Sequence, residues 1–475
     1  MKIFVKKLFM RLGLFSIGSL GSALLNLVLL PVTTSFLTPE EYGKTSMFFL
    51  AQTFLIYIIY LGFDQAFTRE YHDQMNKRAL LQQAMIVPLI GAMALQAILI
   101  IFSSGFSRIL FASPTYSYAI YLLAGSISLL IFERFILLYI RMQNHAVKFS
   151  VYSILVKLVV LLTTLFFLYM YSPTFITVVY GMLVGQMIGD CILIIGNYKF
   201  FFPIERQIDY DLIHKLMHFG LPIVIGTFLY SLLMIIDKVM LRHFTDFSSL
   251  GIYTAGFKIA SALMVLQISF ANFWVPTAYE WFKQRKPIYY YERVSHLIMF
   301  LISLFFLFMV FFKESIIYLL SREYAEAQYV FPLLCFYPLM MTISETTNLG
   351  IVFSKKSHLN IAASFIAVAV AFICHLLLIP ISGAIGAACA TAAGYLTFFL
   401  SRTYFSMKHW EGFSVKRQVT LTLILYIFAI FVAYNRNIWL EKSLTIALII
   451  ITISIYNKEV RQILQYFIER KQKKI

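Results

Sequence analysis

The stretch YSILVKLVVLLTTLFFLYM (Tyr152–Met170) carries one charged side chain, Lys157, in nineteen residues. About twenty consecutive apolar residues is the length at which an α-helix crosses the hydrocarbon core of a bilayer. Comparable stretches follow from end to end of the chain, among them Leu12–Val32 and Ile361–Ile379. A water-soluble protein of this size cannot enclose so many long apolar helices. The pattern therefore predicts an all-α polytopic membrane protein.

The composition of the 475-residue chain agrees, with 60 % hydrophobic and 13 % charged residues. Soluble domains have roughly 45–50 % apolar and about 25 % charged residues. These values exclude a soluble enzyme, a disulfide-rich secreted domain and a disordered chain. The four cysteines all lie in apolar segments and have no CxxC spacing, so we interpret them as small apolar side chains rather than as disulfide or metal ligands.

The spacing of apolar stretches predicts about fourteen transmembrane helices. The tenth, near residues 329–352, is the least regular because it contains Pro332, Pro338 and Glu345. The predicted helices are centred near residues 22, 54, 91, 128, 161, 185, 227, 262, 301, 338, 369, 393, 425 and 447.

The basic residues give the predicted helices an orientation. The formal net charge is +17, and with the N-terminus inside, 28 Lys and Arg fall in inner loops and termini, 8 in outer loops and 3 within the spans. Cytoplasmic loops of membrane proteins carry such an excess. We therefore expect both termini in the cytoplasm, and the positive charge requires no nucleic-acid partner.

The two ends of the chain have further expected roles. The basic N-terminal stretch and the apolar run after it resemble a signal peptide, but we expect an uncleaved first span because no clear cleavage site follows. Near the C-terminus, apolar residues at helical spacing between Val460 and Ile468 alternate with Lys, Arg and Gln. We expect this tail to lie along the cytoplasmic membrane surface, with a partner-binding helix as the alternative.

The chain also resembles itself at an offset of about 210 residues. LGLFSIGS (Leu12–Ser19) leads into SFLTPEEYGKTSMFF (Ser35–Phe49), and FGLPIVIG (Phe219–Gly226) leads into HFTDFSSLGIYTAGF (His243–Phe257). In each copy a short loop with Thr and acidic or Ser residues ends in Gly beside Tyr. Internal repeats are common in transporters, and six spans per copy make the copies parallel.

This repeat predicts the domain organisation. We expect a six-helix lobe over residues 1–200, a second six-helix lobe over residues 201–407, and two extra helices with the tail over residues 408–475. Parallel lobes are related by a pseudo-twofold axis along the membrane normal. A cavity between such lobes suits alternating access.

Enzymatic chemistry has no candidate in the sequence. There is no nucleophile elbow, HExxH sequence, Walker sequence or GxGxxG in a suitable context, and no loop is long enough for a nucleotide-binding domain. We therefore expect no catalytic activity, no metal, no cofactor and no ATP hydrolysis.

The remaining chemistry lies in ionisable residues within the spans. A charge at the bilayer centre costs about 2.5–3.5 kcal/mol, so three cations in lipid would cost on the order of 8–10 kcal/mol. We interpret the bases as lining a wet cavity for an anionic substrate and the acids as candidate sites for H⁺ or Na⁺. The bases are Arg134, Lys157 and Lys258, and the acids are Glu133, Asp190 and Glu345.

A structural interpretation stays open beside this one. Glu133 or Asp190 could simply neutralise Lys157. Because adjacent residues on a helix point about 100° apart, Glu133 and Arg134 cannot both face one direction. Asp64 and Asp237, near the ends of the second and seventh spans, are more easily explained as interfacial residues.

Three phrases resemble a known family: FLTPEEYG (Phe36–Gly43), GFDQAFTREYHD (Gly62–Asp73) and DKVMLRHFTDFSSLGIYTAGFKIA (Asp237–Ala260). They resemble bacterial polysaccharide exporters, the oligosaccharide-lipid flippases of the MATE-like superfamily that handle O-antigen and capsule units. The likeness extends over the first twelve spans. Asp64, Arg69 and Asp237 match loop residues of that family.

The resemblance implies a bundle in the bacterial cytoplasmic (inner) membrane that moves oligosaccharides linked to undecaprenyl diphosphate to the outer leaflet. Family members carry basic residues in a central cavity, a role that would fall here to Arg134, Lys157 and Lys258. A glycan polymerase complex is a further partner consistent with this assignment. The alternatives are a cation-coupled multidrug exporter of the same superfamily and a scaffold for glycan assembly that transports nothing.

Overall fold

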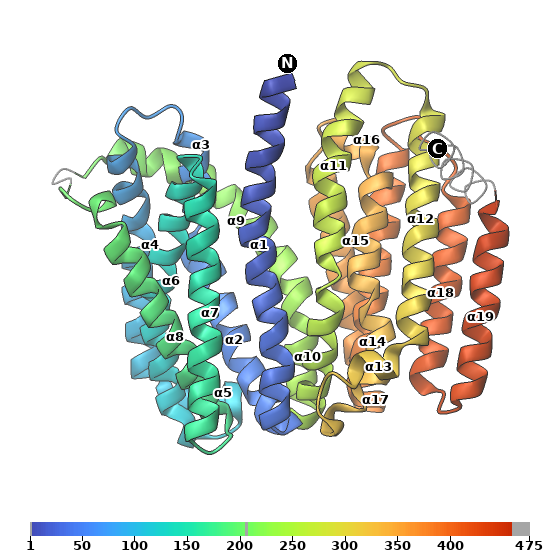
Figure 1. The fold of residues 1–475 in the computed structure, drawn as a ribbon, viewed down its shortest axis with the longest axis horizontal. Helices are drawn as coiled ribbons and strands as arrows, with labels where there is room; N and C mark the ends of the chain where they lie inside the picture. The colour runs from blue at the N-terminus through green and yellow to red at the C-terminus, as the bar shows by residue number, and fades with distance from the viewer. Residues whose placement is uncertain (1, 205–207, 458–475) are drawn as a thin grey trace, which may run out of the picture. The chain divides into compact units, whose positions relative to one another are not determined.

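The computed structural model describes residues 2–204 and 208–457, which are almost entirely helical and contain no strand. The chain forms two compact units, Met1–Ile235 and Ile236–Ile475, here called the N-terminal and C-terminal units. The division falls inside one long helix, whereas the predicted lobe boundaries lie at 200/201 and 407/408 and stay a prediction. Long helices run side by side within each unit (Figure 1).

The N-terminal unit contains the first helices of the chain. Their bounds are α1 Lys2–Phe36, α2 Pro39–Tyr60, α3 Phe63–Glu70, α4 Lys77–Ile101, α5 Ser103–Phe111, η1 Pro114–Tyr116, α6 Ser117–Met142, α7 Ala146–Met170, α8 Phe175–Gly196, η2 Tyr198–Phe200 and the first part of α9, Tyr210–Phe244.

The C-terminal unit contains the rest of α9 and the later helices. Their bounds are α10 Phe247–Ser261, α11 Met264–Lys283, α12 Ile288–Phe311, α13 Lys313–Ile317, η3 Arg322–Tyr324, α14 Ala327–Leu334, α15 Phe336–Thr347, α16 Leu349–Phe353, α17 His358–Met407, α18 Lys416–Tyr434 and α19 Ile438–Ile455.

The helices confirm a multi-pass membrane protein but not the number fourteen. Within the described residues, ten helices are long and apolar enough to cross a membrane, or eleven if α2 and α3 form one bent span. All predicted centres except 262 fall inside a helix, and 262 falls at the break between α10 and α11. Helix α17 has 50 residues, about 75 Å of helix, which is far more than one crossing requires. Its backbone breaks at Gly383, where φ is 52° and ψ is −125°.

The order of the helices repeats along the chain, as the repeated sequence segments indicate. A short helix and a 3₁₀ turn, α5 and η1, follow α4, and α13 and η3 follow α12 in the same way. The two matched loops also begin the next helix in the same manner. Thr38 accepts a hydrogen bond from the Glu41 N–H at the start of α2, and Asp246 accepts one from the Ser249 N–H at the start of α10. Such side-chain caps satisfy free N–H groups of a helix.

Two features of the N-terminal unit position its polar residues. Gly181, Gly185 and Gly189 bring α8 against α7 so closely that a Cβ on Gly185 would lie 2.6 Å from the Val160 Cα. Small residues at this spacing let transmembrane helices approach closely. At the bend between α2 and α3, which is 48°, Gly62 has φ 73° and a Cβ there would lie 2.6 Å from the Gly220 carbonyl oxygen.

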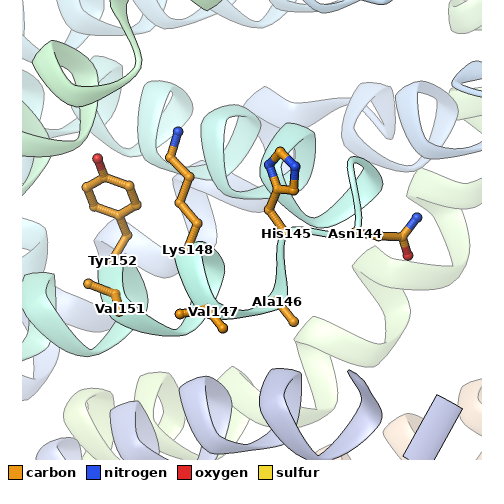
Figure 2. A pocket seen from close by; sticks show the side chains of 7 residues that line it. All are labelled: Asn144, His145, Ala146, Val147, Lys148, Val151 and Tyr152. Atoms are coloured by element: carbon orange, nitrogen blue, oxygen red, sulfur yellow. The ribbon is translucent and has the colours of Figure 1, made fainter. Parts of the chain in front are cut away.

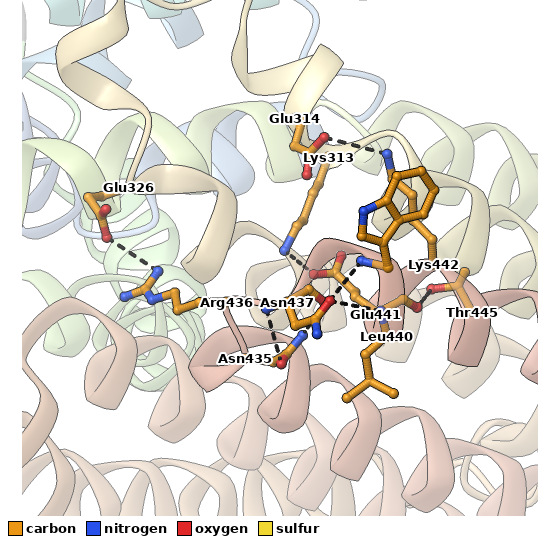
Figure 3. A network of polar contacts seen from close by, with 11 residues as sticks. Lys313, Glu314, Glu326, Asn435, Arg436, Asn437, Leu440, Glu441, Lys442 and Thr445 are labelled. Atoms are coloured by element: carbon orange, nitrogen blue, oxygen red, sulfur yellow. Dashed lines mark hydrogen bonds and ion pairs between the residues drawn. The ribbon is translucent and has the colours of Figure 1, made fainter.

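In the C-terminal unit, a buried ion pair connects the last helix, α19, to the short helix α13. Lys313 Nζ lies 2.7 Å from Glu441 Oε2, and the two side chains are 2 % and 5 % exposed. Burial lowers the pKa of Lys313, and the hydrogen bond to Glu441 opposes that change. Around this pair, Lys442 lies 3.6 Å from Glu314 and Arg436 lies 3.6 Å from Glu326 (Figure 3).

We expect Glu441→Gln to destabilise the protein by about 3–5 kcal/mol, because it leaves the buried Lys313 without its counter-charge. The measurement is the thermal unfolding midpoint in detergent. Lys313→Met combined with Glu441→Leu should recover most of that loss, since both charges are then removed.

Lys442→Met is the matched control, because its pair with Glu314 is about one third exposed. An exposed pair contributes about 0–1 kcal/mol, so this variant should unfold near the wild-type temperature. Equal losses in Glu441→Gln and Lys442→Met would contradict the role given to the buried pair.

Candidate functional site

A hollow of about 330 Å³ lies in the N-terminal unit where α2 bends into α3 and faces α6. It contains both apolar and polar side chains, with one carboxylate and one guanidinium. Its lining residues are Thr53, Ile56, Tyr57, Tyr60, Gly62, Asp64, Gln65 and Arg134.

Arg134 and Asp64 form an ion pair at this hollow, although 70 residues separate them in the chain. The Arg134 Nη2 and Nε groups donate to Asp64 Oδ2 at 2.7 and 3.2 Å. The Asp64 side chain is 9 % exposed, whereas that of Arg134 is 47 % exposed. The carboxylate therefore holds the guanidinium in place while other N–H groups of Arg134 remain available to a ligand. Two N–H bonds to one oxygen suit a fixed orientation, and guanidinium groups are well matched to phosphate.

Next to Arg134 in the sequence, Glu133 belongs to a second cluster, in which two carboxylates accept hydrogen bonds from one amide group. Gln186 Nε2 on α8 donates to Glu133 Oε2 at 2.8 Å and to Asp190 Oδ1 at 2.9 Å. Asp190 is fully buried, and its Oδ2 has no hydrogen-bond partner. Glu133 and Arg134 thus face different partners, as the helical geometry predicts.

Lys157 on α7 lies in the same neighbourhood. It is partly buried and interacts electrostatically with Asp190, but within residues 2–204 and 208–457 no carboxylate lies close enough to form an ion pair with it. The N-terminal unit therefore collects five of the predicted ionisable residues: Asp64, Glu133, Arg134, Lys157 and Asp190.

The C-terminal unit separates the other predicted residues. Lys258 on α10 is partly buried and forms no ion pair with any residue that the structure describes. Glu345 lies 3.9 Å from Arg402 on α17, and its backbone carbonyl accepts a hydrogen bond from Trp274. The remaining predicted residue, Arg69, belongs to the N-terminal unit and lies at the end of α3 with its guanidinium 4.2 Å from the centre of the Phe219 ring.

Asp237, which we expect to be interfacial, lies at the centre of a buried polar network, with 1 % of its surface exposed. Tyr253 donates to its Oδ2 at 2.6 Å, and Lys238 Nζ lies 3.1 Å from the same oxygen. Tyr253 also bonds Thr391 at 2.8 Å, and Thr391 lies 3.2 Å from His375 Nε2. Asp64 is likewise buried in a helix, at 7 % exposure. Both acids are buried because a base lies beside them.

A second and larger hollow, of about 630 Å³, follows the turn from α6 into α7. In Figure 2, His145, Lys148 and Tyr152 lie on one side of the chain and Val147 and Val151 on the other. Lys148 Nζ lies 5.3 Å from the centre of the Phe200 ring. This hollow contains none of the ionisable residues predicted for the site.

The sequence analysis missed the uncharged members of these clusters. Gln186 stands four residues before Asp190, a spacing that places both on one face of α8, so this polar pair in an apolar helix was a usable signal. No local pattern pointed to Tyr60, Thr391 or His375. Among the described residues there is also no group of three or more His, Cys, Asp or Glu side chains that could hold a metal ion.

With this geometry in view, the chain can be compared with known proteins. A family model described as polysaccharide biosynthesis protein matches residues 12–282. No curated protein matches the chain. Among solved structures, the chain is similar to the lipid II flippase MurJ in an inward closed conformation, with a TM-score of 0.70 and 15 % identity over 94 % of this chain and 99 % of that chain.

It is also similar to two conformations of a multidrug resistance MATE family transporter of the MOP superfamily. The inward-facing form gives a TM-score of 0.62 at 14 % identity, and the outward-facing form gives 0.57 at 15 %. Both cover 84 % of this chain, and 97 % and 94 % of those chains. At these identities the likeness establishes the fold, which confirms the expected fold class.

We expect the hollow at Arg134 to be open to water. In a variant whose four cysteines are replaced, Thr53→Cys should react with a charged, membrane-impermeant thiol reagent, because Thr53 lines the hollow and is exposed. The measurement is the labelled fraction of the protein after reaction in permeabilised proteoliposomes, in which the reagent reaches both faces of the membrane.

Leu162→Cys on α7 is the matched control, since Leu162 is 56 % exposed but lies outside the hollow, on an apolar helix. It should face hydrocarbon and stay unlabelled. An unlabelled Thr53→Cys with a folded protein would show that the hollow is closed to water.

Proposed function

We propose that this chain, which belongs to the polysaccharide biosynthesis protein family, is a flippase for oligosaccharides linked to undecaprenyl diphosphate. The family match covers more than half of the chain and bears out the resemblance seen in its loops. The substrate and its route across the cytoplasmic membrane, with both termini in the cytoplasm, belong to the proposal. Membrane lipids and a glycan polymerase complex are the expected neighbours.

The observation that carries the proposal is the half-exposed guanidinium of Arg134 at the hollow. The diphosphate of such a substrate must pass the low-dielectric centre of the bilayer, where a bare charge is costly. A base facing water lowers that cost, and arginine presents donors that match phosphate oxygens. Lys157 and Lys258 are the further bases that we assign to the substrate path.

Alternating access coupled to an H⁺ or Na⁺ gradient is the proposed mechanism. The acids assigned to ion coupling from the sequence are Glu133, Asp190 and Glu345. Glu345 has Arg402 beside it at 3.9 Å, whereas Glu133 and Asp190 share only an amide. This difference favours Glu133 and Asp190, the two acids of the N-terminal unit, as the sites of ion coupling.

A multidrug exporter of the same superfamily is the competing function, supported by the MATE-like fold and by the acids near the hollow. An organic cation would be held by acids, so loss of Arg134 would leave its transport intact or increase it. Transport of a diphosphate-linked lipid should instead decrease when Arg134 is lost. The two functions are therefore separable by one substitution.

Arg134→Gln should weaken binding of undecaprenyl diphosphate about tenfold to a hundredfold, because hydrogen bonds to charged groups contribute about 1.5–3 kcal/mol. It should also abolish transport of the lipid-linked oligosaccharide in proteoliposomes. Arg141→Gln is the matched control, because Arg141 is exposed on the same helix and forms no described ion pair. If the wild-type protein transports a cationic dye but not the lipid, and Arg134→Gln leaves dye transport intact, the multidrug exporter is favoured.

Lys157→Ala should reduce the display of surface glycan in cells without changing the amount of protein in the membrane. Lys157 brings positive charge to the cluster around Asp190, and its loss leaves that cluster more negative. Surface glycan is measured with an antibody or lectin, and protein level by immunoblot. Unchanged display would contradict the place given to Lys157 on the substrate path, and a fall in protein level would assign it to folding.

A further inference from the structure

At two pairs of equivalent positions in the internal repeat, the two units carry the same charge at one and opposite charges at the other. Glu133 and Glu345 stand 212 residues apart, and so do Asp190 and Arg402. Each pair lies on corresponding helices in the element order, α6 with α14–α15 and α8 with the second half of α17. In the C-terminal unit the two positions form an acid–base pair, Glu345 and Arg402. In the N-terminal unit both positions are acids.

Among residues 2–204 and 208–457, no base forms an ion pair with either of those two acids. Gln186 supplies both hydrogens of one amide group, one to Glu133 and one to Asp190, and the second oxygen of Asp190 is buried without a partner. The oxygen without a partner is where a carboxylic acid would carry its proton. A buried polar atom in this state calls for an explanation.

The charges around the pair leave one negative charge uncompensated. Lys157 on α7 interacts electrostatically with Asp190, and Arg134 is held by Asp64. Tyr60 on α2 interacts electrostatically with Arg134, Glu133, Asp64 and Asp190. Fully ionised, the cluster has three carboxylates and two bases. A single proton taken from water makes it neutral, which is the favoured condition inside a membrane.

We propose that Glu133, Gln186 and Asp190 form a proton-binding site, and that a proton held there strengthens the binding of a diphosphate at Arg134. The second half of this statement rests on the proposed function. When the proton is bound, the net charge of the cluster beside the hollow is one unit more positive. An anion at Arg134 then binds more tightly. By linkage, the anion strengthens proton binding by the same factor.

The arrangement selects a proton over a metal cation. Na⁺, like other hard cations, is bound by several oxygen atoms. Here the NH₂ group of Gln186 lies between the two carboxylates and presents hydrogens to both. A cation between the acids would have to displace that group, whereas a proton on Asp190 Oδ2 leaves it in place.

The proton site is tested first without substrate. Infrared difference spectra of the protein in lipid nanodiscs, recorded from mildly acidic to mildly alkaline pH, should show the carbonyl band of a buried carboxylic acid that titrates. Asp190→Asn and Glu133→Gln should each remove or shift this band while the protein keeps its thermal unfolding midpoint. Glu326→Gln is the matched control and should leave the band unchanged, because its side chain is 62 % exposed and lies outside the cluster.

The coupling is tested by binding of undecaprenyl diphosphate to the same nanodiscs over the same pH range. Wild-type affinity should increase at least fivefold towards acidic pH, within the range usual for coupled sites. The Asp190→Asn protein should bind the lipid tightly at every pH in this range, because its asparagine side chain stays neutral as the protonated Asp190 would be. Replacing Na⁺ by K⁺ in the buffer should leave the affinity for the lipid unchanged.

The outcomes separate the two proposals. A titrating band with no binding of the diphosphate lipid would overturn the proposed function and leave the proton site standing. Binding of the lipid without a titrating band, or with a band that survives both Asp190→Asn and Glu133→Gln, would overturn the proton site and leave the function standing. Dependence of binding on Na⁺ would also overturn it.

Discussion

A charge inside a membrane needs water, a counter-charge or a hydrogen bond, and the polar interior of this protein follows from that requirement. Lys313 with Glu441, Arg402 with Glu345, and Lys238 with Asp237 each bring a base beside an acid in the C-terminal unit. In the N-terminal unit, Arg134 and Asp64 do the same. Pairing lets charged residues remain in helices whose other faces are almost wholly apolar.

The two units meet this requirement with different results. At equivalent positions of the repeat, the C-terminal unit neutralises Glu345 with Arg402, while the N-terminal unit leaves Glu133 and Asp190 bridged by Gln186. The same two positions therefore hold an ion pair in the C-terminal unit and the proposed proton-binding acids in the N-terminal unit. The helices supply the same scaffold in both, and one residue change decides which role it has.

Backbone geometry decides where water can reach these charges. Helix α2 ends at Tyr60, the chain bends at Gly62, and α3 places Asp64 beside Arg134. Only a residue without a side chain fits at Gly62, since its φ is positive and the Gly220 backbone lies against it. The bend therefore creates both the hollow and the ion pair that lines it. In the proposed function, the prenyl chain of the substrate remains in lipid while the hollow holds its charged diphosphate.

Local properties of the sequence determined much of this protein. Apolar runs such as Tyr152–Met170 predicted the membrane helices, and the phrases at Thr38 and Asp246 predicted the repeat, because helix length and capping depend on neighbouring residues. The charges within the spans were also visible, and the orientation of Glu133 and Arg134 followed from helical geometry. Only the tertiary structure decided their partners. Asp64 meets Arg134 across 70 residues, and Asp237 meets Tyr253 and Thr391 in a buried network, through packing between helices that no local pattern specifies. For the same reason, the sequence could name the acids but could not tell that Glu345 lies 3.9 Å from Arg402 whereas Asp190 is hydrogen-bonded to Gln186.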